Sequence, residues 1–343
     1  EVDRVLTAHF DTKILPRIGP TAYGGEVTEG KHLGRTIRWS PQGFEWESNS
    51  KHVEDMVELC GLKLESKGAP TPITKATGKG RRDIDDTLNE TDAQTFRQAA
   101  GTGLYMSIDR PSLQFAMSVV MSGMSEPKVV HQLQVVRVAR YVLQHPGESW
   151  LFGYQADPKT LYVYTDTDWA ADELTRKFVS CTVERYGSHM IDCSVAKQSL
   201  VALSSGEAEF YGIVRAVATS KQTSQILEQI GMQSEVIIAS DSSAARGICT
   251  RTGSGKVRHL SIKELWIQES YRKKEFQLVS VDTLLNWADI GTKAHTSERL
   301  TSLLRQMPLR LGEGQKQALA CLVKSNENSR RGHGGDGEDC DAW

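Results

Sequence analysis

The stretch L-Y-V-Y-T-D-T-D-W-A-A-D at residues 161–172 begins like a buried strand and then runs into carboxylates. β-prone side chains occupy residues 161–164, whereas Asp166 and Asp168 stand two residues apart. In an extended chain that spacing places both carboxylates on one face, although aspartate is a poor strand former. Either the acids simply terminate the strand, or they hold something positively charged. We expect the strand to end at Asp166 and Asp168 to turn away with Trp169.

The sequence that follows predicts a compact α/β domain. Strands are expected at 159–166, 177–186, 189–196, 236–240 and 276–281, and helices at 205–229, 242–249 and 259–272, with a last helical region from Trp287. Three strands therefore precede a long helix, and single strands then alternate with helices. This order indicates a mixed sheet flanked by helices.

The sequence before residue 155 predicts a smaller α+β part. Short strands are expected at 18–27 and 32–39, joined by glycine turns, and a helix at 49–60. A polar linker follows at 65–90, and helices then occupy residues 91–145 until H-P-G at 145–147 stops the last one. We divide the chain into segments 1–64, 65–90, 91–150 and 155–311, and a polar tail at 312–343 that we expect to be disordered.

Composition limits the classes of function. The 343 residues carry a formal net charge of −2, so any nucleic-acid surface must be local rather than spread over the chain. The six cysteines form neither a C-x-x-C pair nor a zinc-binding spacing, which favours reduced thiols in an intracellular protein. No window approaches the ~18 uninterrupted apolar residues of a membrane span. The start lacks Met and a signal-peptide pattern, so we interpret the chain as cut from a longer, non-secreted protein.

Four carboxylates of the predicted sheet domain fall at strand ends or helix starts: Asp166, Glu209, Asp241 and Asp289. Acids at such positions can converge on one point, where they repel one another unless cations neutralise them. A site made only of carboxylates suits hard cations such as Mg²⁺ or Mn²⁺. Two such ions about 4 Å apart can clamp the attacking and leaving oxygens of a phosphodiester.

Each acid also has an ordinary structural interpretation. An aspartate after a strand is usually a turn former or the cap of the next helix, and for Asp241 taken alone that interpretation is the stronger one. Glu207 stands three residues after Ser204, which is capping-box spacing, so we expect a cap partner rather than a ligand. Asp168 stays open as an alternative to Asp166. It is the ordered set of four acids that predicts a metal site.

Residues 161–311 resemble the ribonuclease H domain of copia-type LTR-retrotransposon Pol polyproteins. The runs that carry this resemblance are Y-T-D-T-D-W-A, A-K-Q-S-L-V-A-L-S-S-G-E-A-E-F-Y-G-I, A-S-D-S-S-A-A, V-R-H-L-S-I-K and N-W-A-D-I-G-T-K. The run F-R-Q-A-A-G-T-G-L-Y-M-S-I-D-R-P is similar to the same polyprotein just downstream of the reverse-transcriptase palm. By this resemblance, residues 1–64 are a reverse-transcriptase remnant and residues 91–150 a helical thumb- or connection-like segment.

The resemblance implies a ribonuclease H fold and cleavage of the RNA strand of RNA-DNA hybrids with two Mg²⁺ (or Mn²⁺) ions. Asp166 would bridge both ions, and Glu209 and Asp241 would hold one of them. Asp289 would complete the other ion. The implied partners are the hybrid and the remainder of the Pol polyprotein, its palm and integrase, and the implied location is a cytoplasmic particle or the nucleus.

The resemblance also suggests residues that contact nucleic acid. Phosphate contacts are expected from Lys197, Arg258, Lys263 and Lys293, with a solvated surface charge as an equal alternative for each of them. His259 stands at the start of a predicted helix, where it can contact phosphate or assist product release. We favour a structural packing role for its imidazole.

Rival hypotheses remain open at this point. The polymerase's aromatic-x-Asp-Asp turn is missing, since D-I-D-D-T-L at 83–88 lies in a polar linker, so the chain is not expected to polymerise DNA. An inactive retrotransposon-derived relic that binds nucleic acid or a partner protein is the second hypothesis, because departures such as Cys193 and Ser261 fit either an intact or a decaying copy. Integrases place glutamate last among their acids, and proofreading exonucleases need Asp-x-Glu on the first strand. Here the glutamate is second and the first strand carries Asp-x-Asp, which favours ribonuclease H.

Overall fold

The computed structural model describes residues 2–75, 80–168, 178–198, 202, 204–253 and 265–312. The chain forms two compact units. Unit 1 comprises Glu1–Asn49, Ser149–Thr292 and Leu303–Arg310, and unit 2 comprises Ser50–Glu148, Lys293–Ser302 and Leu311–Trp343. The predicted tail lies outside the described residues from residue 313 onward, and the five predicted segments stay a prediction.

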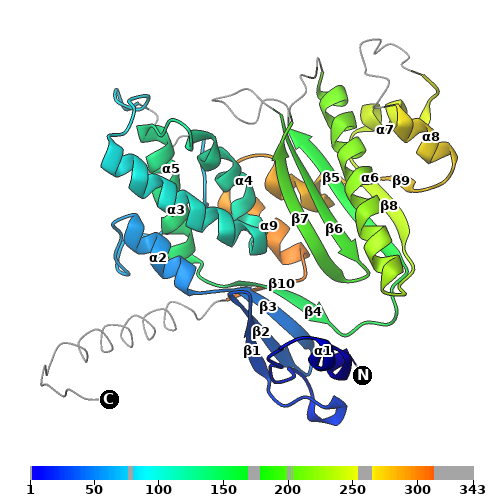
Figure 1. Cartoon of the computed structure of the whole chain (residues 1–343). Helices are drawn as coiled ribbons and strands as arrows, with labels where there is room; N and C mark the ends of the chain where they lie inside the picture. Colours follow the sequence, from blue (N-terminus) through cyan, green and yellow to red (C-terminus); the bar gives the residue numbers. More distant parts are fainter. Residues whose placement is uncertain are drawn as a thin grey trace, which may run out of the picture. The chain divides into compact units, whose positions relative to one another are not determined.

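The sheet that carries the acids is a mixed sheet of unit 1 with the strand order β7-β6-β5-β8-β9 (Figure 1). Its strands are β5 (Thr160–Asp168), β6 (Val179–Tyr186), β7 (His189–Lys197), β8 (Glu235–Ser240) and β9 (Gln277–Ser280). β5 pairs antiparallel with β6 and parallel with β8. β7 pairs antiparallel with β6 at one edge of the sheet, and β9 pairs parallel with β8 at the other edge. The predicted α/β fold class, a mixed sheet flanked by helices, is confirmed.

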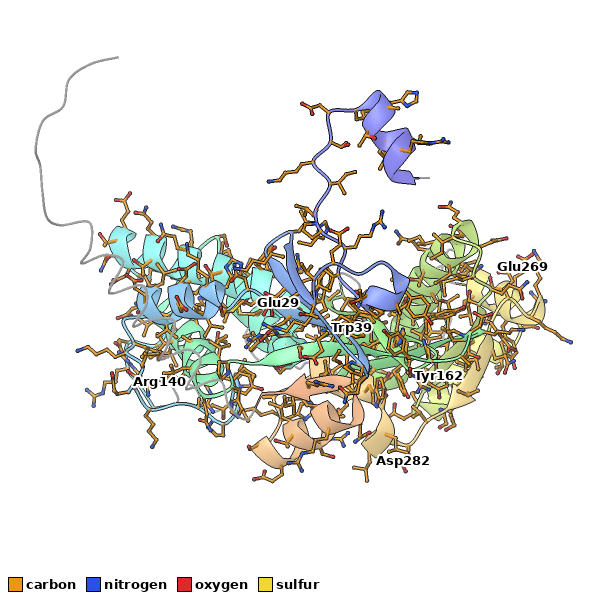
Figure 2. The ribbon with its side chains drawn as sticks, turned by 90° about the horizontal axis from the view of Figure 1, so that it is seen from below. Glu29, Trp39, Arg140, Tyr162, Glu269 and Asp282 are labelled. Carbon is orange, nitrogen blue, oxygen red and sulfur yellow. The ribbon has the colours of Figure 1, made fainter. Side chains whose placement is uncertain are left out.

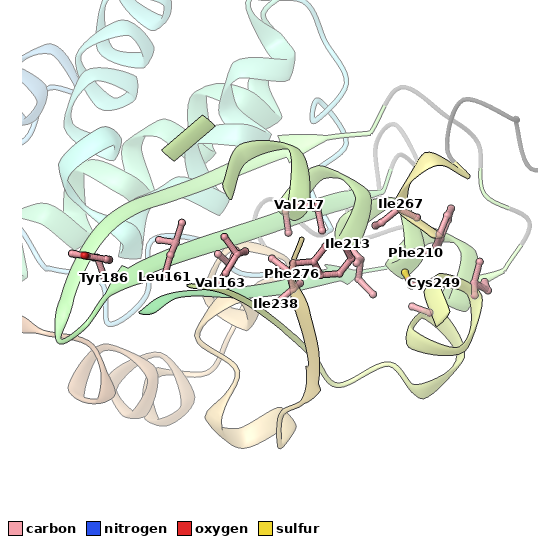
Figure 3. Close-up of a cluster of buried hydrophobic side chains, with 14 of the residues drawn as sticks. Leu161, Val163, Tyr186, Phe210, Ile213, Val217, Ile238, Cys249, Ile267 and Phe276 are labelled. Atoms are coloured by element: carbon pink, nitrogen blue, oxygen red, sulfur yellow. The ribbon is translucent and has the colours of Figure 1, made fainter. Parts of the chain in front are cut away.

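Three helices accompany this sheet: α6 (Ser205–Gln229), α7 (Ser243–Thr250) and α8 (Trp266–Arg272). Leu161 and Val163 of β5 and Ile213 of α6 are fully buried in one apolar cluster (Figure 3). Because successive strand residues face opposite sides, Tyr164 lies on the other face, where its ring stacks on Trp287 with centroids 5.0 Å apart. The alternation of β5 therefore supplies a helix-facing core and a separate aromatic face.

The other sheet of unit 1 has the order β1-β2-β3-β4-β10. Its strands are β1 (Glu29–His32), β2 (Arg35–Ser40), β3 (Gly43–Ser48), β4 (Glu148–Gly153) and β10 (Leu309–Leu311), preceded by α1 (Val2–His9). Glu29 and Trp39 mark this sheet in Figure 2, and the Trp39 indole N–H donates to the Tyr154 hydroxyl over 2.6 Å.

One strand prediction for this part of the chain is wrong, and the strand predicted at 32–39 is confirmed only from Arg35 onward, as part of β2. Residues 18–27 form the short 3₁₀ helix η1 (Thr21–Tyr23) and a single bridge between Ile18 and Val27. Residues 32–39 contain a hairpin turn, because Leu33 and Gly34 have φ of 48° and 73°. Two successive residues with positive φ give the tight turn that joins twisted strands.

Unit 2 is helical and contains α2 (Lys51–Leu59), α3 (Glu90–Asp109), α4 (Pro111–Val120), η2 (Met121–Gly123) and α5 (Val129–Gln144). Gly103 lets α3 approach α4 closely, since an added Cβ would lie 2.8 Å from the Met117 sulfur. Buried Arg110 donates to the carbonyls of His145 and Pro146, which joins the start of α4 to the end of α5. In the described part of the chain, no helix is long and apolar enough to cross a membrane.

Candidate metal centre

Three of the four predicted acids converge. One carboxylate oxygen from each of Asp166, Glu209 and Asp241 lies within 4.8 Å of the other two. Asp166 is buried, and Glu209 and Asp241 are partly buried. Oxygens on opposite sides of a Mg²⁺ ion lie roughly 4 Å apart, so a bound ion would need only a small contraction of this group. An oxygen-only donor set also fits Mg²⁺ or Mn²⁺ better than a soft metal.

The strand topology explains why two of these acids meet. β5 and β8 are parallel neighbours, with Tyr164 opposite Ala239. Asp166 lies two residues beyond Tyr164 and Asp241 two residues beyond Ala239. Side chains near the C-terminal ends of adjacent parallel strands share one edge of a sheet, which is where ligands bind in open α/β sheets.

β5 differs from the prediction at its end. The strand continues to Asp168, which pairs with Val179, so the expectation that it ends at Asp166 is wrong. Asp168 therefore falls on the same face as Asp166 by alternation. Of these two acids, only Asp166 belongs to the three-carboxylate group that the described residues form.

The Asp166 carboxylate is held by a segment far along the chain. The Thr292 hydroxyl donates to Oδ2 of Asp166 over 2.6 Å. Asn286, which is fully buried, donates its amide to the carbonyl of Thr165 over 3.1 Å. These two bonds attach the segment that contains η4 (Thr283–Leu285) and η5 (Trp287–Gly291) to β5, one at the Thr165 carbonyl and one at the Asp166 side chain.

Glu209 reaches the site because α6 lies unusually close to β5. The helix is capped by the Ser204 hydroxyl, which accepts from the Glu207 amide over 3.2 Å, as the capping-box spacing predicts. Gly212 lies directly over Thr167, and a Cβ added at Gly212 would overlap the Thr167 hydroxyl. Glu209 stands three residues before this contact, near the start of the helix.

Asp241 does not act as the cap of the following helix. The Ser242 side chain caps α7 by accepting from the Ala245 amide over 3.3 Å. Asp241 instead accepts a 2.7 Å hydrogen bond at Oδ2 from the Thr283 hydroxyl. The cap half of the ordinary interpretation of Asp241 is therefore wrong, and the side chain stays available to the carboxylate group.

Asp289 is buried, with 3% of its surface exposed, but it does not belong to the group within 4.8 Å. It lies in η5, a 3₁₀ helix, where the sequence predicted the start of a longer helix; α9 (Ser297–Gln306) begins later. Gly291 fits tightly against Cys181 of β6 and Val195 of β7, which seats η5 on the sheet. A ligand role for Asp289 stays a prediction.

The predicted nucleic-acid contacts are only partly described. Lys197 is partly buried and ends β7, with its backbone opposite Val179. Lys293 is also partly buried and belongs to unit 2. Arg258, His259 and Lys263 lie outside the described residues.

Sequence reasoning missed the neutral side chains around the acids. Thr292, Thr283 and Asn286 each donate to Asp166, Asp241 or the backbone beside them. Their only sequence signal was the position of two of them within N-W-A-D-I-G-T-K, around the predicted acid Asp289.

Comparison with known proteins places the chain among transposon proteins. The retrovirus-related Pol polyprotein from transposon TNT 1-94 of Nicotiana tabacum is 26% identical over 257 residues, which are 72% of this chain and 19% of that protein. The corresponding polyprotein from transposon RE2 of Arabidopsis thaliana is 25% identical over 302 residues, 85% of this chain and 20% of that protein. The chain is a homologue of retrovirus-related Pol polyproteins from plant transposons. The predicted resemblance is thereby confirmed.

This Pol homologue spans about one fifth of the length of these curated relatives. It is also 32% identical over 122 residues to secreted RxLR effector protein 161 of Plasmopara viticola, covering 35% of this chain and 85% of that protein. No family model matches the chain. Among solved structures, LC11-RNase H1 in complex with an RNA/DNA hybrid aligns with a TM-score of 0.29 and 18% identity, over 39% of this chain and 94% of that protein.

Proposed function

We propose that this Pol homologue is a ribonuclease H, which cleaves the RNA strand of RNA-DNA hybrids with two Mg²⁺ or Mn²⁺ ions. The observation that carries the proposal is the convergence of Asp166, Glu209 and Asp241 at one edge of a mixed sheet. The order of the acids along the chain supports it as well, because the glutamate comes second and lies near the start of the long helix α6.

The chain's own residues would bind and orient the reacting groups. Asp166 would contact both ions, Glu209 and Asp241 would hold one, and Asp289 would complete the other. The hydroxyls of Thr292 and Thr283 donate to the Asp166 and Asp241 carboxylates and help to orient them. Divalent ions in such a site supply Lewis acidity and neutralise charge on the phosphodiester, and the expected products carry a 3′-hydroxyl and a 5′-phosphate.

Substrate choice would rest on duplex shape and on contacts to 2′-hydroxyls, because RNA-containing duplexes are recognised mainly in this way. The remainder of the Pol polyprotein is the proposed partner. It would supply the polymerase that makes the hybrid, and a cytoplasmic particle or the nucleus is the proposed location.

Cleavage of an end-labelled RNA-DNA hybrid tests the proposal. The parent chain is compared in Mg²⁺ and in Mn²⁺ with Asp166→Asn and Asp241→Asn, and with Asp157→Asn, which changes an exposed acid of unit 1 outside the carboxylate group. We expect the parent and Asp157→Asn to cut only the RNA strand of the hybrid. The two site variants should be inactive although they stay folded.

Single-stranded RNA and double-stranded DNA of the same sequence serve as substrate controls. Equal cleavage of double-stranded DNA would point to another nuclease of the same broad fold. A folded parent that cleaves nothing with either ion would overturn the proposal in favour of the inactive relic.

A further inference from the structure

A short series of hydrogen bonds, one buried and two partly buried, links β5, β6 and the start of α6. The Gln198 side-chain amide donates to the Ser180 hydroxyl and, over 3.0 Å, to the Ala208 carbonyl. The Ser180 and Thr167 hydroxyl oxygens are 2.9 Å apart. We call these three side chains, Thr167, Ser180 and Gln198, together with the Ala208 carbonyl, the Gln198 brace.

The two ends of the Gln198 brace are covalently attached to two of the converging acids. Thr167 is the residue after Asp166, and Ala208 is the residue before Glu209. The brace therefore spans, by hydrogen bonds, the gap between the strand that carries one carboxylate and the helix that carries the other.

The Gln198 amide is the donor that holds the brace together. The Gln198 amide supplies two protons, one to Ala208 and one to Ser180. The Ser180 oxygen accepts from Gln198, and either Ser180 or Thr167 can donate in the bond between their hydroxyls. Loss of the Gln198 amide would leave the Ala208 carbonyl without this donor.

Burial makes the brace stiff. Ser180 and Thr167 are 1% and 5% exposed, and Ala208 is fully buried. The Gln198 backbone is itself fixed, since its N–H donates to the Phe178 carbonyl over 2.8 Å. Buried hydrogen bonds in a low dielectric are stronger than exposed ones, so the amide of Gln198 resists displacement of α6 from the sheet.

We propose that Gln198 is a positioning residue that sets the separation of Asp166 and Glu209, and through it the affinity of the chain for divalent metal ions. This inference rests on the proposed function and deepens it. Mg²⁺ demands near-ideal ligand geometry at 2.0–2.1 Å, and sites of this kind tolerate displacements of only about 0.5 Å. Loss of the brace would let the first turns of α6 move by such an amount without unfolding the sheet.

The test measures Mn²⁺ binding by electron paramagnetic resonance on the full chain, without nucleic acid. Gln198→Ala is compared with Gln155→Ala, a matched control in unit 1. The Gln155 side chain also joins chain segments, because it donates to the Tyr186 carbonyl over 3.3 Å and accepts from the Ser188 amide over 2.7 Å. Those contacts lie at the opposite end of β6 from Ser180.

We expect Gln198→Ala to weaken Mn²⁺ binding about tenfold, the usual size of effects from residues that orient metal ligands. Gln155→Ala should bind Mn²⁺ with the affinity of the parent. Gln198→Ala and Gln155→Ala should both lower the melting temperature of the metal-free chain, measured in a chelator. Ser180→Ala removes the hydrogen bonds of Ser180 to Gln198 and to Thr167 and keeps the bond between Gln198 and Ala208, so it should weaken Mn²⁺ binding in the same direction. It also keeps the test decisive should Gln198→Ala fail to fold.

Parent-like Mn²⁺ affinity in folded Gln198→Ala, or in Ser180→Ala where the first variant does not fold, would overturn the inference. An equal loss in Gln155→Ala would overturn it too, since general destabilisation would then explain the effect. A parent that binds Mn²⁺ but cleaves no hybrid would overturn the ribonuclease proposal and leave the brace intact. A parent that binds no Mn²⁺ would overturn both.

Discussion

Thr292 donates its hydroxyl proton to Oδ2 of Asp166 over 2.6 Å, across 126 residues of sequence. Both side chains are buried, Thr292 completely. The bond engages one carboxylate oxygen of Asp166, so a neutral residue near the end of the sheet unit helps to orient an acid of the candidate metal centre.

Replacement of Thr292 separates this orienting role from simple packing. Thr292→Val keeps the shape of the side chain but removes the hydroxyl, so we expect divalent-metal affinity and hybrid cleavage to fall about tenfold. Thr292→Ser keeps the donor and should retain metal affinity close to that of the parent. Calorimetric titration with Mn²⁺ measures both variants, and equal losses in the two would show that the methyl group, rather than the hydrogen bond, is what matters.

The convergence of acids was predictable because it follows from topology. A strand that ends in Asp-x-Asp, a capped helix and a second strand followed by an acid place Asp166, Glu209 and Asp241 at one sheet edge. The exact end of β5 was not predictable in the same way. Aspartate disfavours strands, but the pairing of Asp168 with Val179 of β6 overrides that preference. This pairing depends on a neighbouring strand, which the local propensity of residues 161–168 does not reflect.

Long-range pairing also hid much of the first sheet. β3 pairs with β4, so that Trp46 lies opposite Trp150, more than a hundred residues later in the sequence. β3 alternates apolar Phe44 and Trp46 with Glu45 and Glu47, a strand-like pattern that the sequence prediction overlooked. The donors Thr292 and Thr283 were missed for a related reason, since single hydroxyl groups carry no periodic pattern and matter only through the partners that the fold gives them.

The close approach of α6 to β5 gives a prediction about stability. Gly212→Ala would place a methyl group on the Thr167 hydroxyl, and overpacking of this kind costs about 1–3 kcal/mol of unfolding free energy. Gly247→Ala is the matched control, because Gly247 lies within α7 with nothing within 4 Å of an added Cβ. That change should stabilise the chain by roughly 0.5–1 kcal/mol. Denaturant unfolding measures both, and a stabilised Gly212→Ala would contradict the packing.

Glu184 predicts an unusual pH dependence of stability. Burial, as the largest cause, raises the pKa of Glu184, and the Asp192 charge adds to this, whereas a 2.6 Å hydrogen bond from Thr223 opposes it. A pKa raised by folding means that the stabilising contribution is complete below the unfolded pKa, about 4.3. That contribution is lost as pH rises through the higher folded pKa. Glu184→Gln should therefore raise the melting temperature at pH 7–8 and lose this advantage near pH 4.

An exposed glutamate of unit 1 provides the opposite control. The Lys273 side chain lies 2.8 Å from Glu269 and lowers the pKa of that carboxyl. The stabilising contribution of Glu269 is present above its unfolded pKa and is lost as pH falls. Glu269→Gln should therefore lower stability slightly at neutral pH and have no effect in acid. Melting curves from pH 4 to 8 that show the same sign for both variants would contradict the assignment for Glu184.

The thiols of partly buried Cys60 and buried Cys249 predict chemical inertness. Burial raises the pKa of Cys60 and of Cys249 to about 12, compared with about 8.5 for an ordinary thiol. The thiolate is the nucleophile. At pH 8 the fraction of each thiol that is thiolate should therefore be on the order of 10³-fold lower in the folded chain than in the unfolded chain. Mass spectrometry after brief treatment with iodoacetamide should find both unmodified in the folded chain and both modified in guanidinium. Modification of Cys249 at the same rate in both conditions would mean that α7 does not pack against the core as the structure describes.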